Sequence, residues 1–507
     1  MRISRFLAGV AVFSFMFGAS YALASFDSYK KELAASEKVA ITYDVFDAAK
    51  AKKQIAQMKK EAKASRKVAS NLTENDLSES AKAMIQEILS KTEPEALDQV
   101  LVAYDNKYDS LPADAQFITL QLQTLRPFRG ILYRVKPYFE DKAGTLAHSA
   151  ILTSFKNLAA NLRWLLDAPE RSRHAVAFFN YIAQPYLIDK ALAPSLDSEA
   201  KIQTWMFNKV RPVMITANNR MQSLSEKNPR IVWDNRIIYG ADSFQDNIDR
   251  FKLVGEIERQ ALIASYENTV SQINFLRSYS IYGAATVSQK LGEVMGIDSV
   301  IGTMFSSTRN GYTLRELRDA IKSAPHFGKH LADCKIINQQ RQSVTCMRES
   351  YELLQSSVKR LATAWEIAKE RPGSNDFAFN TAFAQADVAR GDINVQNVVA
   401  VVEGPTTLRS AITGEYVKFD IQKFYDTPPT NLQDFLPQSF DNLKERQVNL
   451  GKKRPVKYRN YFYGMPETWK IDAYREAFLP DAQNNDDILK ASRIWAHSAG
   501  GMVRLNL

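Results

Sequence analysis

The pattern of apolar positions is most regular between Ser343 and Glu370, where it has the period of an α-helix. Apolar residues recur there at intervals of three and four, at Val344, Met347, Tyr351, Leu354, Val358, Leu361, Trp365 and Ala368. This spacing places them in one stripe along a helix roughly 40 Å long, because a helix rises about 1.5 Å per residue. We expect Leu354 and Leu361, near the middle of the stripe, to be covered most fully by a partner helix. Ser357 lies on the polar side, where a substitution should change stability little.

The helical period extends through most of the chain, so the predicted fold class is mainly α. From Glu74 to Asn228 one amphipathic segment follows another, and prolines end or kink them. Residues 231–239 interrupt this pattern and could form a small hairpin. We therefore predict a multi-helical body that spans residues 71–372.

Beyond Pro372 the pattern changes to a mixture of helices and strands. The run Val398 to Val402 is β-branched, which favours a strand. Residues 417–421 alternate between apolar and polar, as is typical of a half-buried strand. A last short helix is predicted at residues 486–496. The smaller C-terminal region, residues 373–507, is therefore predicted to be mixed α/β.

One fragment across this boundary resembles part of a tetratricopeptide repeat. The resemblance rests on Ala364-Trp365-Glu366-Ile367-Ala368, Pro372, Ala378, Ala382, Ala386 and Gly391-Asp392. These residues fall where that family places its small residues and its inter-helix turn. The resemblance implies that the body could be a degenerate helical-repeat array, although no second copy occurs at the required period.

Two short segments of the long helix resemble enzyme motifs. Met347-Arg348-Glu349-Ser350 is similar to the Glu-Ser pair of lytic transglycosylases, which would imply a helical superstructure and an acid at Glu349. Ser356 and Lys359 have the SxxK spacing of penicillin-binding enzymes, in which the serine is the nucleophile. The downstream Gly-Leu-Met-Gln pattern of the first family is missing, as are the S-D-N and K-T-G motifs of the second. Glu349 is also explained as an acid in the first turn of a helix, and no catalytic residue is predicted.

The N-terminal residues 1–24 have the features of a secretory signal peptide. Arg2 and Arg5 precede an apolar run, and Ala22-Leu23-Ala24 provides small residues at the cleavage position before Ser25. The alternative is an uncleaved membrane anchor, because the apolar run approaches the length that spans a bilayer. No later segment has the long uncharged apolar run of a membrane-spanning helix.

The positive charge of the chain indicates anionic partners. The net charge is +10, and removal of Arg2 and Arg5 with the signal peptide would leave 10 − 2 = +8. Residues 25–70 form a basic, Ala/Lys-rich helical arm with a thin apolar face. This arm is either a solvated helix or an electrostatic contact with an anionic surface. Lipid head groups and envelope polymers are the expected partners, and nucleic acid is not.

The two cysteines, Cys334 and Cys346, lie on either side of the loop that precedes the long helix. Because an exported protein folds in an oxidising compartment, we predict that they form a disulfide. Closing this short loop would stabilise the fold by roughly 3 kcal/mol in the chain-entropy description. The alternative is a pair of free thiols.

The best candidate metal ligands are His326, His330 and Asp333. They would share one face if Pro325 began a helical turn, since their spacing is i, i+4 and i+7. Gly328 weakens such a turn, and the glutamate of an H-E-x-x-H motif is replaced by a phenylalanine. We therefore predict no metal site and no cofactor.

The strongest candidate for ligand binding is a basic segment near the C-terminus, interleaved with aromatic residues. Its candidate contacts are Lys452, Lys453, Arg454, Lys457, Arg459 and Tyr461. Cationic side chains attract anionic polymers, and aromatic rings stack on sugar faces or bases. The alternative is a basic loop that leads into a Tyr/Phe-rich strand packed on the core.

These observations predict an exported, non-enzymatic envelope protein, located in the periplasm or secreted. It would bind or scaffold at an anionic polymer or lipid head groups, and another envelope protein is a further possible partner. The alternative function is a cell-wall-active hydrolase with a lytic-transglycosylase-like helical body.

Overall fold

A computed structural model describes most of the chain between Ser25 and Ser498. The main described parts are residues 25–34, 72–91, 93–140, 191–227, 229–239, 250–287, 311–332, 334–337, 343–371, 385–410, 413–440 and 466–498. Shorter described pieces are residues 46–47, 55, 59, 180–182, 184–185, 187–188, 290 and 378. The predicted signal peptide lies outside the described residues.

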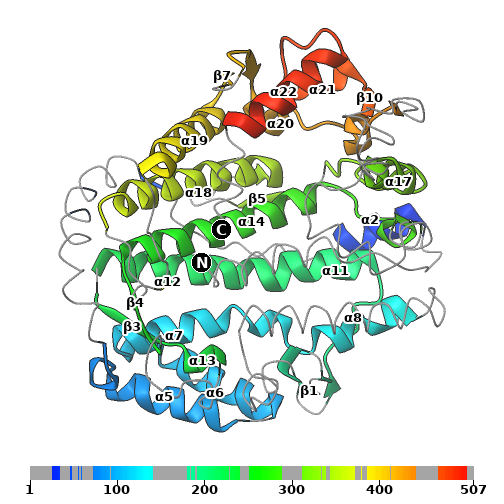
Figure 1. The fold of residues 1–507 in the computed structure, drawn as a ribbon. Helices are drawn as coiled ribbons and strands as arrows, with labels where there is room; N and C mark the ends of the chain where they lie inside the picture. The colour runs from blue at the N-terminus through cyan, green and yellow to red at the C-terminus, as the bar shows by residue number, and fades with distance from the viewer. Residues whose placement is uncertain are drawn as a thin grey trace, which may run out of the picture.

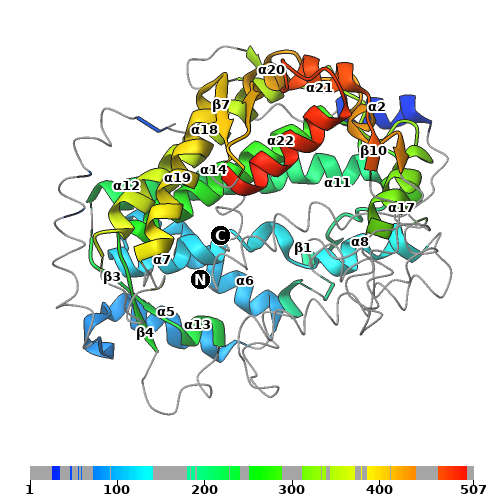
Figure 2. The same cartoon turned by 45° about the horizontal axis from the view of Figure 1, so that its top comes forward.

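The described fold is mainly α-helical, as the apolar period predicts, and its helices lie in successive layers (Figure 1). The first layers contain α5 (Glu79–Ser90), α6 (Pro94–Asn106), α7 (Ala113–Gln123) and α8 (Ile131–Glu140). They are followed by α11 (Glu199–Trp205), α12 (Arg211–Lys227), α14 (Glu256–Ser278), α18 (Cys346–Ala368) and α19 (Gln385–Glu403). Two further helices, α2 (Phe26–Ala34) and α17 (Gly311–Lys322), lie at one end of these layers (Figure 2).

Short helical turns and two-stranded sheets connect the main helices. The turns are η1 (Glu74–Asp76), η2 (Tyr108–Ser110), η3 (Arg126–Phe128), the π-helical η4 (Met206–Val210) and α13 (Arg236–Tyr239). In the body, β1 (Leu187–Ile188) pairs with β2 (Ala191–Leu192), β3 (Ile231–Asp234) with β4 (Phe251–Val254), and β5 (Lys335–Ile337) with β6 (Ser343–Thr345). Each of these pairs is antiparallel.

The part of the C-terminal region that follows α19 packs on the outer side of α18 and α19. It contains β7 (Thr406–Arg409), β8 (Tyr416–Phe419), α20 (Ile421–Asp426), η6 (Leu432–Phe435), β9 (Ser439–Phe440), β10 (Pro466–Thr468), α21 (Ile471–Ala477) and α22 (Asn485–Ser498). A separate apolar core, which includes Val401, Leu408, Phe419 and Ile488, joins α22 to the β7–β8 hairpin. The predicted mixture of helix and strand in this region is therefore confirmed.

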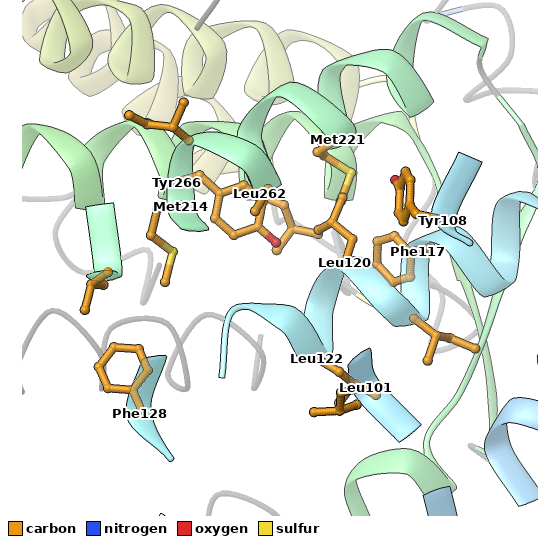
Figure 3. Packing of buried hydrophobic residues seen from close by; sticks show 14 of the residues in the cluster. Leu101, Tyr108, Phe117, Leu120, Leu122, Phe128, Met214, Met221, Leu262 and Tyr266 are labelled. Carbon is orange, nitrogen blue, oxygen red and sulfur yellow. The ribbon is translucent and has the colours of Figure 1, made fainter. Parts of the chain in front are cut away.

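The largest apolar core lies between the first helical layers and the pair α12–α14 (Figure 3). Phe117 and Leu120 of α7 lie close to Met221 of α12 and Tyr266 of α14 in this core. The ring of Phe117 also contacts Trp233 edge to face, with 5.7 Å between the centroids. Burial of these large side chains is the main favourable contribution to folding in this half of the molecule.

The helices α14 and α18 pack antiparallel along a seam of small residues. Three contacts recur at seven-residue intervals on both helices: Ser271 with Ser350, Ala264 with Ser357, and Ile257 with Ala364. Small side chains let two helix backbones approach closely, so hydroxyls of one helix reach carbonyls of the other. The hydroxyl of Ser357 donates to the carbonyl oxygen of Ala264 at 2.9 Å.

Most of the predicted apolar stripe is buried, namely Met347, Tyr351, Val358, Trp365 and Ala368, but the seam corrects the prediction at its middle. Leu354 and Leu361 are only half-buried, whereas the neighbouring Leu353 is 1 % exposed. Ser357, expected on the polar side, is buried under α14. The reason is that α14 covers the face of α18 that carries small polar residues, a face that a count of apolar positions does not detect.

In the fragment similar to a tetratricopeptide repeat, residues 364–368 lie on α18 and Ala386, Gly391 and Asp392 lie on α19, and these two helices pack against each other. The indole Nε1 of Trp365 donates to Asp392 at 2.7 Å. Gly391 lies directly against the Trp365 ring, where a Cβ atom would be 2.2 Å from Cζ2. Close packing of the indole therefore requires glycine at this position of α19.

Two strand predictions differ from the structure. The β-branched run Val398–Val402 is helical and forms the end of α19, where Val401 and Val402 are buried. Tertiary packing overrides the local β propensity at this site. Residues 231–239 do not form a hairpin with each other, because β3 pairs with the distant strand β4, as in the pair Asp234 and Phe251 (251 − 234 = 17 residues apart), and 236–239 is helical. The strand predicted at 417–421 is present as β8, although Ile421 begins α20.

The helix α2, directly after the predicted cleavage position, is docked on the body. Tyr29 and Leu33 are both 2 % exposed, and the Tyr29 hydroxyl hydrogen-bonds to Gln203 of α11. Arg277 of α14 donates to the carbonyl oxygen of Leu33 at 2.9 Å. This part of residues 25–70 therefore packs on the body and is not a solvated arm.

Two later positions of the same stretch contact α18. The backbone N–H of Phe46 donates to the hydroxyl of Ser356 at 2.7 Å. Lys59 forms an ion pair with Glu366 at 3.2 Å. Both contacts are with the helical body. At least one basic residue of this stretch, Lys59, therefore pairs with an acidic residue of the same chain.

The predicted disulfide between Cys334 and Cys346 is confirmed. Cys334 precedes β5, and Cys346 is the first residue of α18. The backbone N–H of Cys346 also donates to the carbonyl oxygen of Cys334 at 3.1 Å. The bridge therefore closes the β5–β6 hairpin at the point where the long helix begins.

Candidate functional site

The predicted anionic-ligand residues Lys452, Lys453, Arg454, Lys457, Arg459 and Tyr461 lie outside the described residues. The structure does describe the two places where the chain enters and leaves this part. Phe440 of β9 pairs with Pro466 of β10, and Ser439 pairs with Thr468. The two ends of residues 441–465, called here the basic segment, are therefore held side by side.

Polar contacts reinforce this pairing at the base of the basic segment. The backbone N–H of Gln438 donates to the carbonyl oxygen of Thr468 at 2.7 Å. The hydroxyls of Ser439 and Thr468 are also 2.7 Å apart. Arg318 of α17 donates to the carbonyl oxygen of Gln438 at 2.9 Å, and its guanidinium lies 4.7 Å from the centroid of the Phe440 ring. These contacts fix β9 and β10 to the helical body.

A group of half-buried aromatic rings lies beside the same pair of strands. Phe435, Tyr474 and Phe478 contact one another with centroid distances of 5.3 to 5.6 Å. Phe424 extends the group toward Phe275 of α14. Burial raises the pKa of Tyr474 to about 12, and its hydroxyl donates to the carbonyl oxygen of Phe435 at 2.7 Å. The rings join the C-terminal region to the body.

Glu349, the residue similar to a transglycosylase acid, is held in a fully buried ion pair. Nη2 of Arg211 donates to both carboxylate oxygens, at 2.8 and 3.0 Å. Asn274 of α14 donates a third hydrogen bond to Oε2. The Glu349 and Arg211 side chains are 0 % and 1 % exposed. A polymeric substrate cannot reach this carboxylate, so Glu349 joins α12, α14 and α18 and is not a general acid.

The Ser356–Lys359 pair is likewise used for packing. Ser356 is buried, and its hydroxyl accepts the backbone N–H of Phe46. Lys359 forms an ion pair with Glu403 of α19 at 3.3 Å. A nucleophilic serine requires access to substrate, and the burial of Ser356 prevents this.

A second buried ion pair, between Glu267 of α14 and Arg360 of α18, lies in the same interface. Nε of Arg360 donates to Oε1 of Glu267 at 2.7 Å, while Oε2 of Glu267 has no hydrogen-bond partner among the described residues. Burial raises the pKa of Glu267 to about 7, although the Arg360 guanidinium opposes this shift. These buried charges cannot be recognised from the helical pattern, in which polar positions are expected to be exposed.

His326 and His330, the candidate metal ligands that were not predicted to form a site, have separate packing roles. The residues after Pro325 form turns, not a helix, and Gly328 has a positive φ of 80°. The His326 ring stacks on Phe26 of α2 at 4.2 Å. His330 is held by its backbone, whose N–H donates to Thr430. Burial lowers the pKa of both histidines. Asp333 lies outside the described residues, and the described part of the chain contains no group of metal-ligating side chains.

A group of arginines that was not among the sequence-based candidates lies where η3 leads into α8. Asp98 of α6 accepts hydrogen bonds from Arg129 Nη1 at 2.9 Å, from Arg126 Nε at 3.4 Å and from the Tyr181 hydroxyl at 2.8 Å. Arg134 follows in the first turn of α8. Burial, and then the Asp98 charge, raise the pKa of Tyr181. Three arginines within residues 126–134 are a signal that the sequence itself contains.

The geometry defines a mainly α-helical protein with a disulfide and with a C-terminal pair of strands that holds the basic segment. No helix in the described part of the chain is long and apolar enough to cross a lipid bilayer. Neither the known protein families, nor the curated proteins, nor the solved structures provide a match to this chain.

Proposed function

We propose that this protein is an exported, non-enzymatic envelope protein that binds or scaffolds at an anionic surface, in the periplasm or outside the cell. Its ligands would be an envelope polymer or lipid head groups, and its contacts would be Lys452, Lys453, Arg454, Lys457, Arg459 and Tyr461. The positive net charge of +10 favours an anionic partner.

The observation that carries this proposal is the pairing of β9 with β10. Because Phe440 pairs with Pro466, a run of basic and aromatic residues enters and leaves at one place on the surface. The hydrogen bond from Arg318 of α17 to the carbonyl oxygen of Gln438 anchors this place to the helical body. Such an arrangement suits a binding protein, since attraction of an anionic polymer needs clustered charge but no catalytic group.

Export is supported by the A-x-A ending of residues 22–24 and by the bridge between Cys334 and Cys346. Disulfides persist in oxidising compartments and are rare in the bacterial cytoplasm. We expect the mature protein to begin at Ser25, which N-terminal sequencing of exported protein would test. An intact Met1 on membrane-bound protein would favour the anchor alternative.

The binding test is co-sedimentation of the purified protein with peptidoglycan and with vesicles that contain an anionic lipid. Substitution of Lys452, Lys453 and Arg454 by glutamine should reduce binding strongly, and added salt should have the same effect. The matched control removes the same charge from exposed sites elsewhere, through Lys107→Gln, Lys227→Gln and Lys209→Gln. Equal binding by both triple variants would contradict a specific role of the basic segment.

The same assay separates binding from hydrolysis. Release of soluble fragments from peptidoglycan would favour the hydrolase alternative, whereas co-sedimentation without release favours binding. Any release would need a site other than Glu349, because the ion pair with Arg211 is buried.

A further inference from the structure

The β7–β8 hairpin presents two different faces. Leu408 of β7 is 1 % exposed and belongs to the apolar core that joins the hairpin to α22. On the opposite face, called here the outer face, Arg409 pairs with Tyr416 and Thr407 pairs with Lys418. All of these outer side chains are exposed, and Tyr416 is 69 % exposed. In Figure 1 β7 lies beside α22 at the boundary of the molecule, so a partner can reach the outer face.

The turn of the hairpin determines which backbone groups pair within it. The N–H of Ser410 donates to the carbonyl oxygen of Glu415 at 2.8 Å, and the N–H of Gly414 donates to the carbonyl oxygen of Ser410 at 3.0 Å. Together with a φ of 73° at Gly414, these bonds define a G1 bulge. From this bulge onward, hydrogen-bonded and non-hydrogen-bonded pairs alternate along the antiparallel ladder. The backbone N–H and C=O groups of Tyr416 and Lys418 therefore point away from β7.

Two hydrogen bonds at other edge positions agree with this alternation. The hydroxyl of Ser498 in α22 donates to the carbonyl oxygen of Arg409 at 3.0 Å, on the edge of β7. The N–H of Asp420, directly after β8, donates to the carbonyl oxygen of Phe478 at 3.0 Å. Both bonds run outward from the ladder, and both give an edge group a partner within the chain.

The middle of β8, in contrast, forms an open edge. The outward N–H and C=O groups of Tyr416 and Lys418 have no hydrogen-bond partner among the described residues. Unpaired backbone groups on an edge strand are a template for a strand of another chain. Prolines, bulges and covering segments protect many natural edges, whereas an aromatic residue such as Tyr416 favours strand formation. This edge is therefore suited to the addition of a strand.

The outer face carries positive charge and no acid. Arg409 is held at the turn, where its Nε donates to the carbonyl oxygen of Gly414 at 3.2 Å. Neither Arg409 nor Lys418 forms an ion pair with a carboxylate of the described residues. Glu415, the acidic residue of the turn, pairs with Arg493 of α22 at 3.4 Å. A carboxylate on an added strand would therefore meet uncompensated positive charge at this face.

This charge determines which kind of strand fits the edge. Residues directly opposite each other on adjacent strands share one face, where opposite charges stabilise the pair and like charges destabilise it. A second copy of this chain would double the positive charge of the face, whereas an acidic strand would neutralise it. On the inner face Val417 is only half-buried, so an apolar residue of the added strand would cover it.

We propose that the edge of β8 binds an extended acidic segment of another protein as an added strand. Acidic residues of the segment lie opposite Tyr416 and Lys418, and the apolar residues between them cover Val417. Main-chain hydrogen bonds supply the affinity, and the alternating side chains supply the specificity. The ligand is a polypeptide, and its surface shares no residue with the basic segment. The inference therefore goes beyond the proposed function, and either can fail alone.

The probe is a synthetic eight-residue peptide in which valine and glutamate alternate, and fluorescence anisotropy at constant ionic strength measures its Kd. With the glutamates on the outer face, their N–H groups point toward β8. Methylation of the glutamate nitrogens should weaken binding by roughly tenfold or more, because main-chain hydrogen bonds are lost. Methylation of the valine nitrogens, which point away from β8, is the matched control and should leave the Kd nearly unchanged. A peptide with lysine in place of glutamate should not bind.

Two substitutions of one residue localise the binding to this edge. Lys418→Gln removes the charge and keeps the N–H, so it should weaken binding about two- to fivefold. Lys418→Pro also removes the N–H, which points away from β7, so the hairpin keeps its ladder. It should weaken binding by a further factor of roughly ten. Lys107→Gln removes the same charge from an exposed site elsewhere and should leave the Kd unchanged.

The outcomes that would overturn the proposal are distinct. They are equal binding of the two methylated peptides, equal binding by Lys418→Gln and Lys418→Pro, and no binding of the glutamate peptide by the unaltered protein. If Lys418→Pro does not fold, the two methylated peptides provide the same comparison. A dimer in sedimentation velocity that Lys418→Pro abolishes would identify a second copy as the occupant and would also overturn the proposal.

Discussion

Ser271 and Ser350 exchange hydrogen bonds across the interface of α14 and α18. The hydroxyl of Ser271 donates to the carbonyl oxygen of Ser350 at 2.7 Å, and the hydroxyl of Ser350 donates to the carbonyl oxygen of Ser271 at 2.8 Å. Each serine thus bonds to the backbone of the opposite helix, which requires the two backbones to lie close together. The size of these side chains therefore determines the spacing of the two longest described helices.

We expect Ser350→Leu to destabilise the protein by about 1–3 kcal/mol or more, because a larger side chain must push the helices apart. Ser350→Ala keeps the spacing and should cost only about 1 kcal/mol, the usual net value of a hydrogen bond. Glu352→Leu, at a half-exposed position two residues later, is the control for adding a leucine to α18. Urea unfolding provides the free energies. Equal losses for Ser350→Leu and Glu352→Leu would contradict a close seam.

Two adjacent leucines of α18 provide the sharpest test of its orientation. Leu353 is 1 % exposed and belongs to the main apolar core, whereas Leu354 is half-buried. We expect Leu353→Ala to cost about 2–5 kcal/mol, the usual range for a fully buried leucine. Leu354→Ala should cost about 1 kcal/mol or less, because much less apolar surface changes its environment. The reverse order in urea unfolding would contradict the burial of Leu353 and the partial exposure of Leu354.

Gly391→Ala should destabilise the protein although it places alanine inside a helix. An exposed glycine-to-alanine change in a helix interior stabilises by about 1 kcal/mol. Here the added Cβ would lie 2.2 Å from Cζ2 of Trp365, so we expect a loss of about 1–3 kcal/mol. Trp365→Phe replaces the indole by a smaller ring. In the Trp365→Phe protein, Gly391→Ala should therefore lower the free energy of unfolding by less than it does in the unaltered protein. Additive effects in this double-mutant cycle would show that the two residues do not interact.

The stability of the protein should depend on pH through Glu267. Its pKa in the folded protein is about 7, above the ordinary value of 4.5. Between these pH values the folded state therefore binds a proton that the unfolded state has released. The contribution of Glu267 to the free energy of unfolding should fall as the pH rises from about 4.5 to about 7, and stay low above that range.

Glu267→Gln removes this titration while it keeps an oxygen for Arg360. The free energy of unfolding of the unaltered protein, minus that of Glu267→Gln, should decrease over this pH range. Guanidinium chloride unfolding at several pH values measures the difference. Glu352→Gln is the control, since Glu352 is a half-exposed glutamate of α18. It shows how much of the pH-dependent difference arises from the loss of a glutamate that is not fully buried. A constant difference would mean that Glu267 does not titrate in this range.

The sequence is a good guide to the fold class and a poor guide to the interfaces. The three-four spacing of residues 343–370 predicts α18, because repetition over many turns distinguishes a helix from a strand, although Ser343–Thr345 form the strand β6. It fails for Ser350 and Ser357, since small polar residues can be buried when their hydroxyls find carbonyls on a neighbouring helix. Partners such as Arg211 and Glu349 are 138 residues apart, and no local pattern connects them.

Among the candidate sites, too, some features can be predicted from the sequence and others depend on the fold. The bridge between Cys334 and Cys346 is present as predicted, and that prediction needed only the cysteine number and the expectation of export. The position of Arg134 depends on Pro194 and Trp205, which only the fold brings near it. Three closely spaced arginines are visible in the sequence, but the bonds of Arg126 and Arg129 to Asp98 of α6 are not.

The docking of α2 has a consequence for the order in which the chain folds. During synthesis α2 emerges before the surfaces that cover it, which are Gln203 of α11, Arg277 of α14 and Leu331. Contacts so distant in the chain close late, because the loops that they define must first lose their freedom. Tyr29 and Leu33 therefore stay exposed while about three hundred residues are added behind them. The helix that begins at Phe26 is thus among the last parts of the body to reach its final place.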